Sequence, residues 1–350
     1  MSDAQSFALQ CPASAYESEA IELAHGGGGL LTHRLIEDIF RPAFATTSTD
    51  LTHDGAIVEI GGLRLAFTTD SYVVRPLFFP GGDIGSLAVN GTINDLAMCG
   101  AEPLCLSVGF VIEEGFALND LRRVVRSMRV AADIACVKLV TGDTKVVERG
   151  KGDGLYVNTT GIGRIMQGID VAPQNVRPGD AVLLSADIGR HGIAVMSVRE
   201  GLAFESAIES DSAPLASIVI QLMRAGMPLH CLRDPTRGGL ATSLVEIASA
   251  SGLDIRIIEE TIAVSEPVRG ACEILGLDPL YVANEGCFIA IVPAEAAEQA
   301  LSILQSAPGG AFAAVIGRVE EGVGRVILEN GLGSGRVLDM LTGEQLPRIC

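Results

Sequence analysis

Both halves of the chain follow the same loose plan, and this plan limits the folds that the sequence can adopt. In each half, glycine-rich turns open into segments of helical spacing, and a glycine ends the helix before an apolar strand begins. The first half closes with the strand-like segment 154–165, and VRPGDAVLLS (176–185) starts again with a turn and a buried strand. The sequence therefore predicts two domains of mixed α and β structure (α+β), with a boundary near 165–178.

Residues outside the two domains are poor in regular patterns. The leader 1–20 is polar, and four consecutive glycines (26–29) precede a helical segment that reaches residue 40. Such a glycine run can close over phosphates or act as a hinge. We divide the chain into a leader and glycine-rich segment (1–40), an N-terminal domain (41–170), a C-terminal domain (171–330) and a tail (331–350). Glycine and serine in 330–337 predict that the tail is flexible.

Composition and charge exclude several classes of protein. Hydrophobic residues make up 48% of the chain, which is enough for buried cores. The net charge of −18 argues against a nucleic-acid partner. Without an apolar run of membrane-helix length or a basic-then-apolar N-terminus, we expect no membrane partner and a soluble, cytoplasmic protein.

Six aspartates sit at predicted strand ends, in glycine turns or inside an apolar helix, rather than on polar helix faces. They are Asp54, Asp70, Asp83, Asp95, Asp143 and Asp234. Each alone is an ordinary turn former or cap. If several converge, a cation must neutralise them, because two carboxylates 4 Å apart repel by about 4 kcal/mol at an effective dielectric constant of 20. Mg²⁺ with a nucleotide polyphosphate fits best, although the P-loop and protein-kinase motifs are absent from the sequence.

The sequence ends on a cysteine, Cys350, after a pliable segment. A thiol on a movable arm suits chemistry in which a group is carried between sites, whereas a frayed end that happens to finish on cysteine is the plain alternative. None of the eight cysteines forms a C-x-x-C pair, and most others lie in apolar surroundings. We therefore expect buried, reduced thiols there, and no disulfide or zinc framework.

Several segments in order along the chain carry a specific resemblance. They are TTDSYVVRPLFFPGGDIGSLAVNGTINDLAMCGAEP, TGDTKVV, TGIG, RDPTRGG, ANEG and the final PRIC. Together they resemble the HypE family of hydrogenase maturation proteins, within the group of aminoimidazole ribonucleotide synthetase and selenophosphate synthetase. FFPGGDIG and PRIC distinguish the HypE family from its relatives, and only the leader is unmatched.

The resemblance implies a fold, an activity and partners. The fold is two-domain and PurM-like (aminoimidazole ribonucleotide synthetase-like), with a homodimer formed through the N-terminal domains and ATP bound at their interface. The activity is ATP-dependent dehydration of a carbamoyl group that the carbamoyltransferase HypF loads onto Cys350. The resulting thiocyanate supplies cyanide to iron on the HypC–HypD complex, for the [NiFe] centre of a hydrogenase.

Site residues follow from matching these motifs position by position. Asp54, Asp70, Asp95 and Asp234 match the carboxylates that bind metal and nucleotide, and the predicted nucleotide site extends to Asp83, Asn94, Asp143 and His191. Besides Cys350, the catalytic candidates are Lys145, as a phosphate contact or base, and Glu285, as a base. The plain alternatives are a polar helix face for Asn94, a loop histidine for His191 and a surface carboxylate for Glu285.

Two other functions stay open at this point. A related synthetase would phosphorylate a free small molecule such as selenide or a formamidine and would not need the thiol of Cys350. A non-catalytic scaffold would hand its tail to a partner, and its pure dimer would hydrolyse no nucleotide.

Overall fold

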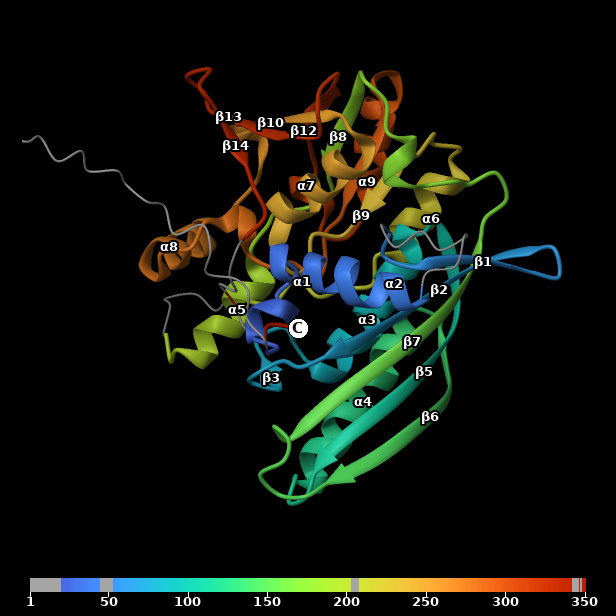
Figure 1. The fold of residues 1–350 in the computed structure, drawn as a ribbon, viewed down its shortest axis with the longest axis vertical. Coiled ribbons are helices and arrows are strands. Elements are labelled where there is room, and N and C mark those ends of the chain that lie inside the picture. The colour runs from blue at the N-terminus through green and yellow to red at the C-terminus, as the bar shows by residue number, and fades with distance from the viewer. Residues whose placement is uncertain (1–19, 45–52, 203–207, 342–345, 347) are drawn as a thin grey trace, which may run out of the picture.

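A computed structural model describes residues 20–44, 53–202, 208–341, 346 and 348–350. These residues form two α+β domains, each built on one large sheet, and the two sheets follow each other along the long axis of the molecule (Figure 1). The predicted α+β fold class is confirmed. Among the described residues, no helix is long and apolar enough to cross a membrane.

The N-terminal domain contains a five-stranded sheet with the order β1-β2-β7-β5-β6. Its strands are β1 (Ala56–Ile60), β2 (Leu63–Tyr72), β5 (Ala101–Glu113), β6 (Lys138–Val147) and β7 (Leu155–Ile165). Only the β5–β6 pair is parallel. Helices α3 (Ile84–Met98) and α4 (Leu118–Ile134) pack together on one face, and the short strands β3 (Phe78–Phe79) and β4 (Gly82–Asp83) precede α3.

The two helices of this domain differ in how they are buried. Helix α4 buries one stripe, which includes Val124 and Met128, and turns its arginines outward. Helix α3 is buried on nearly every side, because it lies between the N-terminal sheet and the C-terminal domain. The polar residues of α3 therefore do not form a solvent-exposed face, and each needs a hydrogen-bond partner inside the protein.

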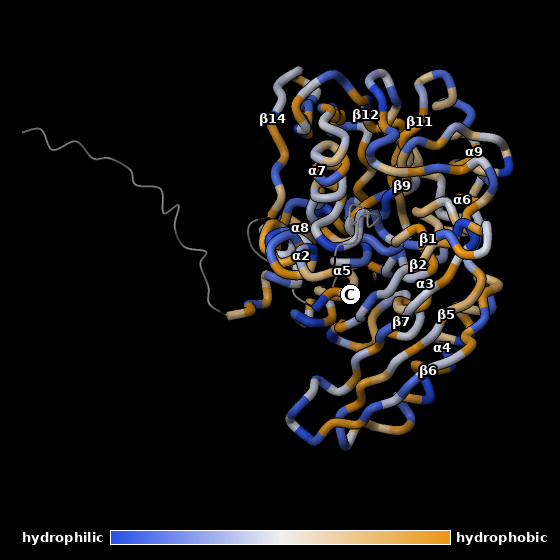
Figure 2. The backbone as a smooth tube through the Cα atoms, turned by 45° about the vertical axis from the view of Figure 1, so that its right-hand side comes forward, coloured by the Kyte–Doolittle hydropathy of each residue, from blue (hydrophilic) through white to orange (hydrophobic). Residues whose placement is uncertain are grey.

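The face of the N-terminal sheet opposite α3 and α4 has no cover among the described residues. Hydrophobic and hydrophilic residues alternate along β5, β6 and β7, as expected for a sheet with two different faces (Figure 2). The strand register places five large apolar residues on the open face, each between 37% and 61% exposed. They are Val58, Ile60, Leu63, Phe67 and Val111.

The C-terminal domain contains a seven-stranded sheet with the order β14-β13-β10-β12-β8-β11-β9. Its strands are β8 (Asp180–Leu184), β9 (Cys231–Arg233), β10 (Asp254–Ile258), β11 (Ile289–Pro293), β12 (Ala314–Glu320), β13 (Val326–Glu329) and β14 (Gly335–Leu338). Its helices are α5 (Arg190–Arg199), α6 (Ala216–Arg224), α7 (Gly239–Ser251), α8 (Glu266–Leu275) and α9 (Ala297–Ser306). Short 3-10 turns lie at η3 (Pro173–Asn175), η4 (Glu259–Thr261), η5 (Pro279–Tyr281), η6 (Ala294–Ala296) and η7 (Gly310–Phe312).

One hydrophobic core joins the two domains. It runs from the N-terminal sheet through Leu87 and Ile93 of α3 to Leu222 of α6 and Leu304 of α9. A second core lies between α7 and the other side of the C-terminal sheet and includes Leu244 and Ile316. Because α3 belongs to a core that spans both domains, carboxylates on α3 can face residues of the C-terminal domain across a fixed junction.

The segment before β1 and the tail both lie against the junction. The former contains η1 (Leu23–Gly26), α1 (Leu30–Leu35), the π-helical turn η2 (Ile36–Phe40) and α2 (Arg41–Phe44), between the two sheets in Figure 1. The tail was predicted to be flexible from 331 onward, and this is wrong for 335–338. These residues form β14, which is antiparallel to β13. The hairpin is closed because the Asn330 side chain accepts hydrogen bonds from the N–H groups of Leu332 and Ser334 in the turn between the two strands.

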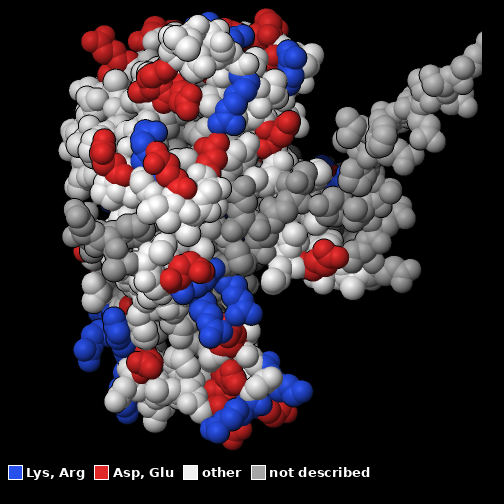
Figure 3. Space-filling view, turned by 90° about the vertical axis from the view of Figure 1, so that its left-hand side faces the viewer, with Lys and Arg blue, Asp and Glu red and all other residues white. Residues whose placement is uncertain are grey.

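Charge is distributed unevenly between the domains. On the face shown in Figure 3, acidic residues predominate over the upper, C-terminal domain, whereas Lys and Arg gather with them over the lower, N-terminal domain. On this face, the excess of acidic residues therefore lies over the C-terminal domain.

Candidate active site

Three carboxylates from distant parts of the chain meet at the domain junction. Asp54 precedes β1, Asp95 lies on α3, and Asp234 directly follows β9. One oxygen from each carboxylate lies within 4.8 Å of the others. We call these three residues the acidic cluster. The sequence analysis named all three, and their convergence is what it predicted for a metal site.

The surroundings of the acidic cluster are suited to a bound cation. Burial, together with repulsion from neighbouring carboxylates, raises the pKa of both Asp95 and Asp234 well above the ordinary value. Asp54 pairs with Arg233 through Oδ1 at 3.0 Å, but its Oδ2 is buried without a hydrogen-bond partner. An unpartnered carboxylate oxygen beside two others is the donor set that Mg²⁺ prefers, so these residues fit the predicted ion.

Arg233 links the cluster to a fourth carboxylate. Besides Asp54, its guanidinium contacts Glu246 of α7 at 2.5 Å, and attraction to both acids raises its pKa. Thr68 of β2 donates to Asp95 Oδ2 at 2.8 Å and thereby orients that side chain toward the cluster. Neither Arg233 nor Glu246 was named by the sequence analysis.

A small pocket of about 30 Å³ connects the acidic cluster with the end of the tail. Asp95 and Asp234 of the acidic cluster line this pocket, and so do Asp70, Glu285 and Cys350. We call it the acidic pocket. Burial is the first cause that raises the pKa of Glu285 well above its usual range, and Asp234 adds to the shift. Asp70, Glu285 and Cys350, all named from the sequence, therefore line one pocket with two members of the acidic cluster.

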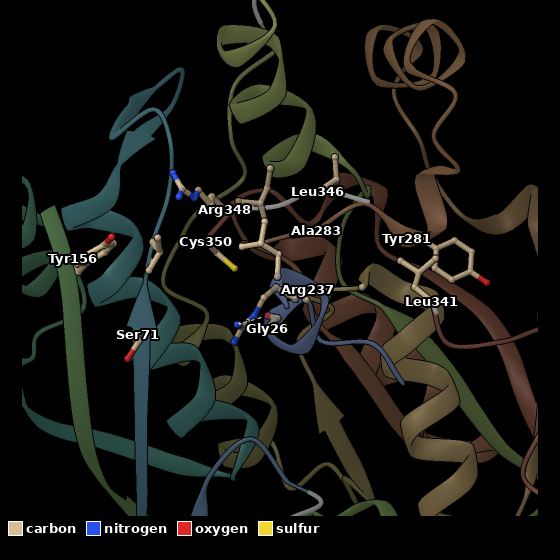
Figure 4. A pocket seen from close by; sticks show the side chains of 15 residues that line it. Gly26, Ser71, Tyr156, Arg237, Tyr281, Ala283, Leu341, Leu346, Arg348 and Cys350 are labelled. Carbon is tan, nitrogen blue, oxygen red and sulfur yellow. Dashed lines mark hydrogen bonds between the residues drawn. The ribbon is translucent and has the colours of Figure 1, made fainter. Parts of the chain in front are cut away.

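Cys350 also lies in a larger cavity of about 400 Å³, which we call the tail cavity. Figure 4 shows its sulfur near the middle of this cavity and directed toward Arg237. Attraction to Cys350 is the first cause that raises the pKa of Arg237, ahead of attraction to Asp70, whose carboxylate lies 3.8 Å away. The side chains of Ser71 and Tyr156 border the cavity from the N-terminal sheet (Figure 4).

The main chain of the last residues is held by several donors. The N–H groups of Val73 and Arg75 donate to the main-chain oxygens of Cys350 and Arg348, at 3.2 and 3.1 Å. Arg199 of α5 adds a bond of 2.6 Å to the Arg348 oxygen. The Arg348 side chain pairs with Asp153 in the loop before β7. The tail is therefore seated across both domains of its own chain.

His191, which the sequence predicted as a nucleotide ligand, contacts the tail in this structure. Its ring is fully buried at the start of α5, where Nε2 lies 2.8 Å from the Ile349 carbonyl oxygen and Nδ1 lies 2.8 Å from Ser210 Oγ. Because a carbonyl only accepts, Nε2 carries the proton. Burial lowers the pKa of His191 to about 4, so the ring is neutral at neutral pH.

This lowered pKa predicts a pH dependence of stability. Between pH 6.5 and 4 the unfolded chain protonates His191 and the folded protein does not, so its contribution is full above pH 6.5 and is lost as pH falls toward 4. As the pH falls from 6.5 to 4, we expect the free energy of unfolding of His191→Gln to decrease less than that of wild type. The difference between the two decreases should be at most about 3 kcal/mol. Urea unfolding of both proteins at pH 4 to 7 measures the difference.

A buried carboxyl with the opposite shift makes the comparison with the variant necessary. The pKa of Asp211 is raised to about 6, first by burial, so its contribution is present at low pH and is lost as pH rises through 6. The two effects oppose each other in wild type, and only the difference between wild type and variant isolates His191. Equal pH profiles for the two proteins would contradict the buried, neutral state of His191.

Two further predicted nucleotide ligands, Asp83 and Asn94, make structural contacts within the chain. Asp83 caps α3, because its Oδ1 accepts from the N–H groups of Gly85 and Ser86 at 2.7 and 3.1 Å. Asn94 is fully buried on α3, donates to the main-chain oxygens of Ala213 and Glu285 and accepts from an N–H of the C-terminal domain. Its amide holds the domains together and is not directed into the acidic pocket.

Asp143 and Lys145 do not join the acidic cluster within this chain. They lie on β6 as an exposed ion pair of 3.5 Å. The strand register puts both on the open face of the sheet, opposite α3. Lys145 is opposite Val111, which is opposite Tyr156, so Lys145 shares a row with a residue that borders the tail cavity. Two strand spacings separate Lys145 from Tyr156, or about 10 Å.

Arg237 and Asp211 were missed by the sequence analysis. Arg237 lies in the RDPTRGG motif that was singled out, but its contact with Cys350 depends on tail placement, which no local pattern encodes. Asp211 accepts from the N–H groups of Glu285 and Gly286 and so fixes the turn that carries Glu285. A Cβ on Gly286 would overlap the Asp211 main chain, so only glycine allows this approach.

The glycine run lies beside the same residues. Gly26 accepts a hydrogen bond of 3.2 Å from Arg237, and a Cβ on Gly29 would collide with the Leu341 carbonyl. Helix α1 covers a cleft of about 640 Å³ that also contains the acidic cluster. We call it the α1 cleft. It is large enough for a nucleotide, and the acidic cluster lies on its wall.

Comparisons with known proteins agree with this geometry. Residues 52–165 match the family "AIR synthase related protein, N-terminal domain", and residues 177–329 match "AIR synthase related protein, C-terminal domain". The chain is 52% identical to carbamoyl dehydratase HypE of Azotobacter vinelandii over 332 residues, which cover 95% of this chain and 97% of that protein.

Two solved structures are similar over most of the chain. One is the hydrogenase maturation protein HypE in complex with ATP (TM-score 0.80, 48% identity), for which the match covers 95% of this chain and 100% of that one. The other is a HypE–HypF complex (TM-score 0.83, 47% identity), with 88% and 99% covered.

Proposed function

The chain belongs to the HypE family of carbamoyl dehydratases, and from this premise we propose how its residues carry out the reaction. The protein uses ATP to dehydrate an S-carbamoyl group on its own Cys350 to a thiocyanate, which supplies cyanide ligands for the iron of [NiFe]-hydrogenase. The alternative of a synthetase acting on a free small molecule is disfavoured, because relatives named HypE match at about half identity over nearly the whole chain.

One observation carries the proposal. Cys350 lines the acidic pocket of its own chain, together with Glu285 and two members of the acidic cluster. A substrate group on that sulfur would extend into the space between the carboxylates and Arg237. An enzyme that acts on its own tail needs this proximity, and an enzyme for a free substrate does not.

The chemistry requires that the amide oxygen leave as phosphate and that both N–H protons be removed. The terminal phosphoryl group of ATP goes to the oxygen, the C–O bond breaks, and the products are the thiocyanate, ADP and phosphate. Arg237, next to Cys350, is placed to stabilise negative charge on the oxygen. Glu285, which lines the acidic pocket together with Cys350, is placed to accept a proton from the nitrogen.

We assign the acidic cluster to Mg²⁺ and the α1 cleft to ATP. Asp54, Asp95 and Asp234 would hold the ion, and Asp70 lines the acidic pocket with Asp95 and Asp234. When bound, Mg²⁺ supplies charge that neutralises the phosphate oxygens. The orphaned Asp54 Oδ2 is the observation that supports this assignment.

We also propose a homodimer formed through the open face of the N-terminal sheet. Five large apolar side chains lie exposed there, beside Asp143 and Lys145. A second copy on this face would bury the apolar residues and bring additional groups near the tail cavity. Lys145 would then act at the site as a phosphate contact or base, which its exposed position in the single chain does not explain.

The dimer proposal predicts a difference between two exposed isoleucines. Ile60 is 61% exposed on the open face, and Ile134 is 67% exposed at the end of α4, on the other side of the sheet. We expect Ile60→Lys to weaken association by at least 10-fold, because it places a charge in an apolar interface, and Ile134→Lys to leave association unchanged. Sedimentation at several concentrations distinguishes the two. A monomeric wild type, or dimers of equal strength in both variants, would contradict the proposal.

The partners follow from the same family. We propose that a HypF-type carbamoyltransferase loads Cys350, in keeping with the solved HypE–HypF complex of a similar chain. We propose a HypC–HypD-type complex as the acceptor of the cyano group. Among the described residues, no disulfide joins two cysteines, which fits a reducing compartment and our proposal of a cytoplasmic location.

Peptide-resolved mass spectrometry tests the proposed function. The protein is carbamoylated by its transferase, incubated with or without Mg–ATP, and digested, and the peptide that ends at Cys350 is weighed. We expect the carbamoyl adduct to lose the mass of one water only when Mg–ATP is present. Modification of a different cysteine, or the same loss without ATP, would overturn the proposal.

A further inference from the structure

A buried pair, His191 and Ser210, connects the FFPGGDIG motif with the end of the tail, and neither the fold nor the proposed reaction has used it so far. Ser210 is 8% exposed, and its main-chain N–H donates to the Pro80 oxygen at 2.9 Å, in the turn between β3 and β4. The Phe79 ring packs edge-on against the His191 ring, with the ring centroids 5.4 Å apart. The hairpin formed by β3 and β4 therefore contacts both members of the pair, Ser210 through Pro80 and His191 through Phe79.

The hydrogen bonds of this pair have a single consistent direction. The N–H of Ser212 donates to Ser210 Oγ at 3.1 Å, so the hydroxyl of Ser210 is available to donate to His191 Nδ1. With Nδ1 as acceptor, the neutral ring carries its proton on Nε2 and donates to the Ile349 carbonyl. Ser210 thus selects the tautomer of His191 that can bind the tail.

The bond to Ile349 acts on the peptide group that joins Ile349 to Cys350. The Ile349 side chain is 3% exposed in the core and anchors the residue, whereas Cys350 lines the acidic pocket and directs its sulfur toward Arg237, which lines the same pocket (Figure 4). The position of the sulfur relative to Glu285 is then set by how firmly this last peptide group is held.

We propose that His191, oriented by Ser210, is a positioning residue that fixes the depth at which Cys350 enters the acidic pocket. The proposal rests on the proposed function for its consequence, because it is the carbamoyl group on Cys350 that must be placed. Loading by a transferase needs an accessible thiol instead, so the His191 contact helps dehydration and does not help loading.

The first measurement concerns the unloaded protein and needs no enzymatic activity. Full-length protein is alkylated with iodoacetamide, and the modification of Cys350 is followed by mass spectrometry of its peptide. We expect Ser210→Ala and His191→Ala to raise the alkylation rate of Cys350 about 3- to 10-fold, as the loss of one buried hydrogen bond predicts. His191→Gln, which retains a side-chain N–H donor, should restore part of the protection.

A matched control exists on the same helix as His191. Ser197 is also 8% exposed, and its hydroxyl donates only within α5, to Ala194. Ser197→Ala removes the same atom at the same burial without touching the tail, and we expect its Cys350 alkylation rate to equal that of wild type. If His191→Ala does not fold, Ser210→Ala and His191→Gln against Ser197→Ala still decide the question.

The second measurement separates positioning from general damage. In Ser210→Ala, carbamoylation of Cys350 by the transferase should proceed at the wild-type rate or faster, while dehydration with Mg–ATP should slow about 10-fold. Equal alkylation in Ser210→Ala and Ser197→Ala, or equal losses of loading and dehydration, would overturn the proposal. If wild type itself dehydrates nothing, the proposed function fails, and the alkylation rates still decide whether the pair holds the tail.

Discussion

Replacing Cys350 with alanine is expected to reduce thiocyanate formation below detection while the binding of Mg–ATP stays at the wild-type level. The structure brings only this thiol to the acidic pocket among the described cysteines, since Cys99, Cys231, Cys272 and Cys287 are buried elsewhere. Without the sulfur there is no atom to hold the carbamoyl group next to Glu285. Nucleotide binding should persist because the acidic cluster and the α1 cleft do not include Cys350.

Cys136 provides the matched control for this experiment. Its thiol is exposed, at the end of α4 and away from the tail cavity, so a freely accessible cysteine is removed without a change in the site. Cys136→Ala should form thiocyanate at the wild-type rate. Full activity in Cys350→Ala, or a loss in Cys136→Ala equal to that in Cys350→Ala, would exclude Cys350 as the carrier.

Replacing Asp234 with asparagine is expected to have the second large effect, with opposite signs on activity and stability. Turnover should fall by at least about 100-fold, because one of three oxygens that hold the proposed ion is lost. Without metal and nucleotide, however, the variant should unfold at a temperature about 2 °C or more above wild type. The substitution removes a buried carboxyl whose neighbours Asp54 and Asp70 repel its charge.

The two signs make this prediction specific. Thermal unfolding of wild type and Asp234→Asn, each with and without Mg–ATP, should show the variant to be more stable alone and less stabilised by ligand. Asp278→Asn serves as the control, because Asp278 pairs with Arg336 on the surface and lies outside the cluster. A variant that is destabilised without ligand, or that keeps wild-type turnover, would contradict the metal assignment.

The sequence predicted the acidic site best where the position of a side chain depends on local structure. Asp70 lies near the end of strand β2 and Asp234 lies in the turn between β9 and α7, the strand-end and glycine-turn settings that the pattern indicated. Asp95 lies in an apolar helix, and a charge on such a helix must face a partner or a ligand. These are features that a few neighbouring residues determine.

The structural contacts that were not predicted from the sequence have two physical origins. Asp83 could have been recognised from the sequence as a helix cap, because Ser86 stands three residues after it and completes a capping box. His191 and Asn94 could not, since the main-chain atoms that they bind belong to Ile349 and to Ala213, more than one hundred positions away along the chain. Arg237 was missed for the same reason, because its contact with Cys350 exists only once the tail is seated.

The strand β14 limits how far Cys350 can travel. Because Gly335–Leu338 pair with β13, only residues after 338 can detach from the protein while the sheet stays intact. A free segment from 339 to 350 has a root-mean-square reach of about 20 Å, and about 40 Å if fully stretched. The tail is therefore a short tether that is anchored at the edge of the C-terminal sheet. A transferase that loads Cys350 must bring its own catalytic centre within that distance of β14. The length of the tether therefore restricts how the partner enzyme can dock.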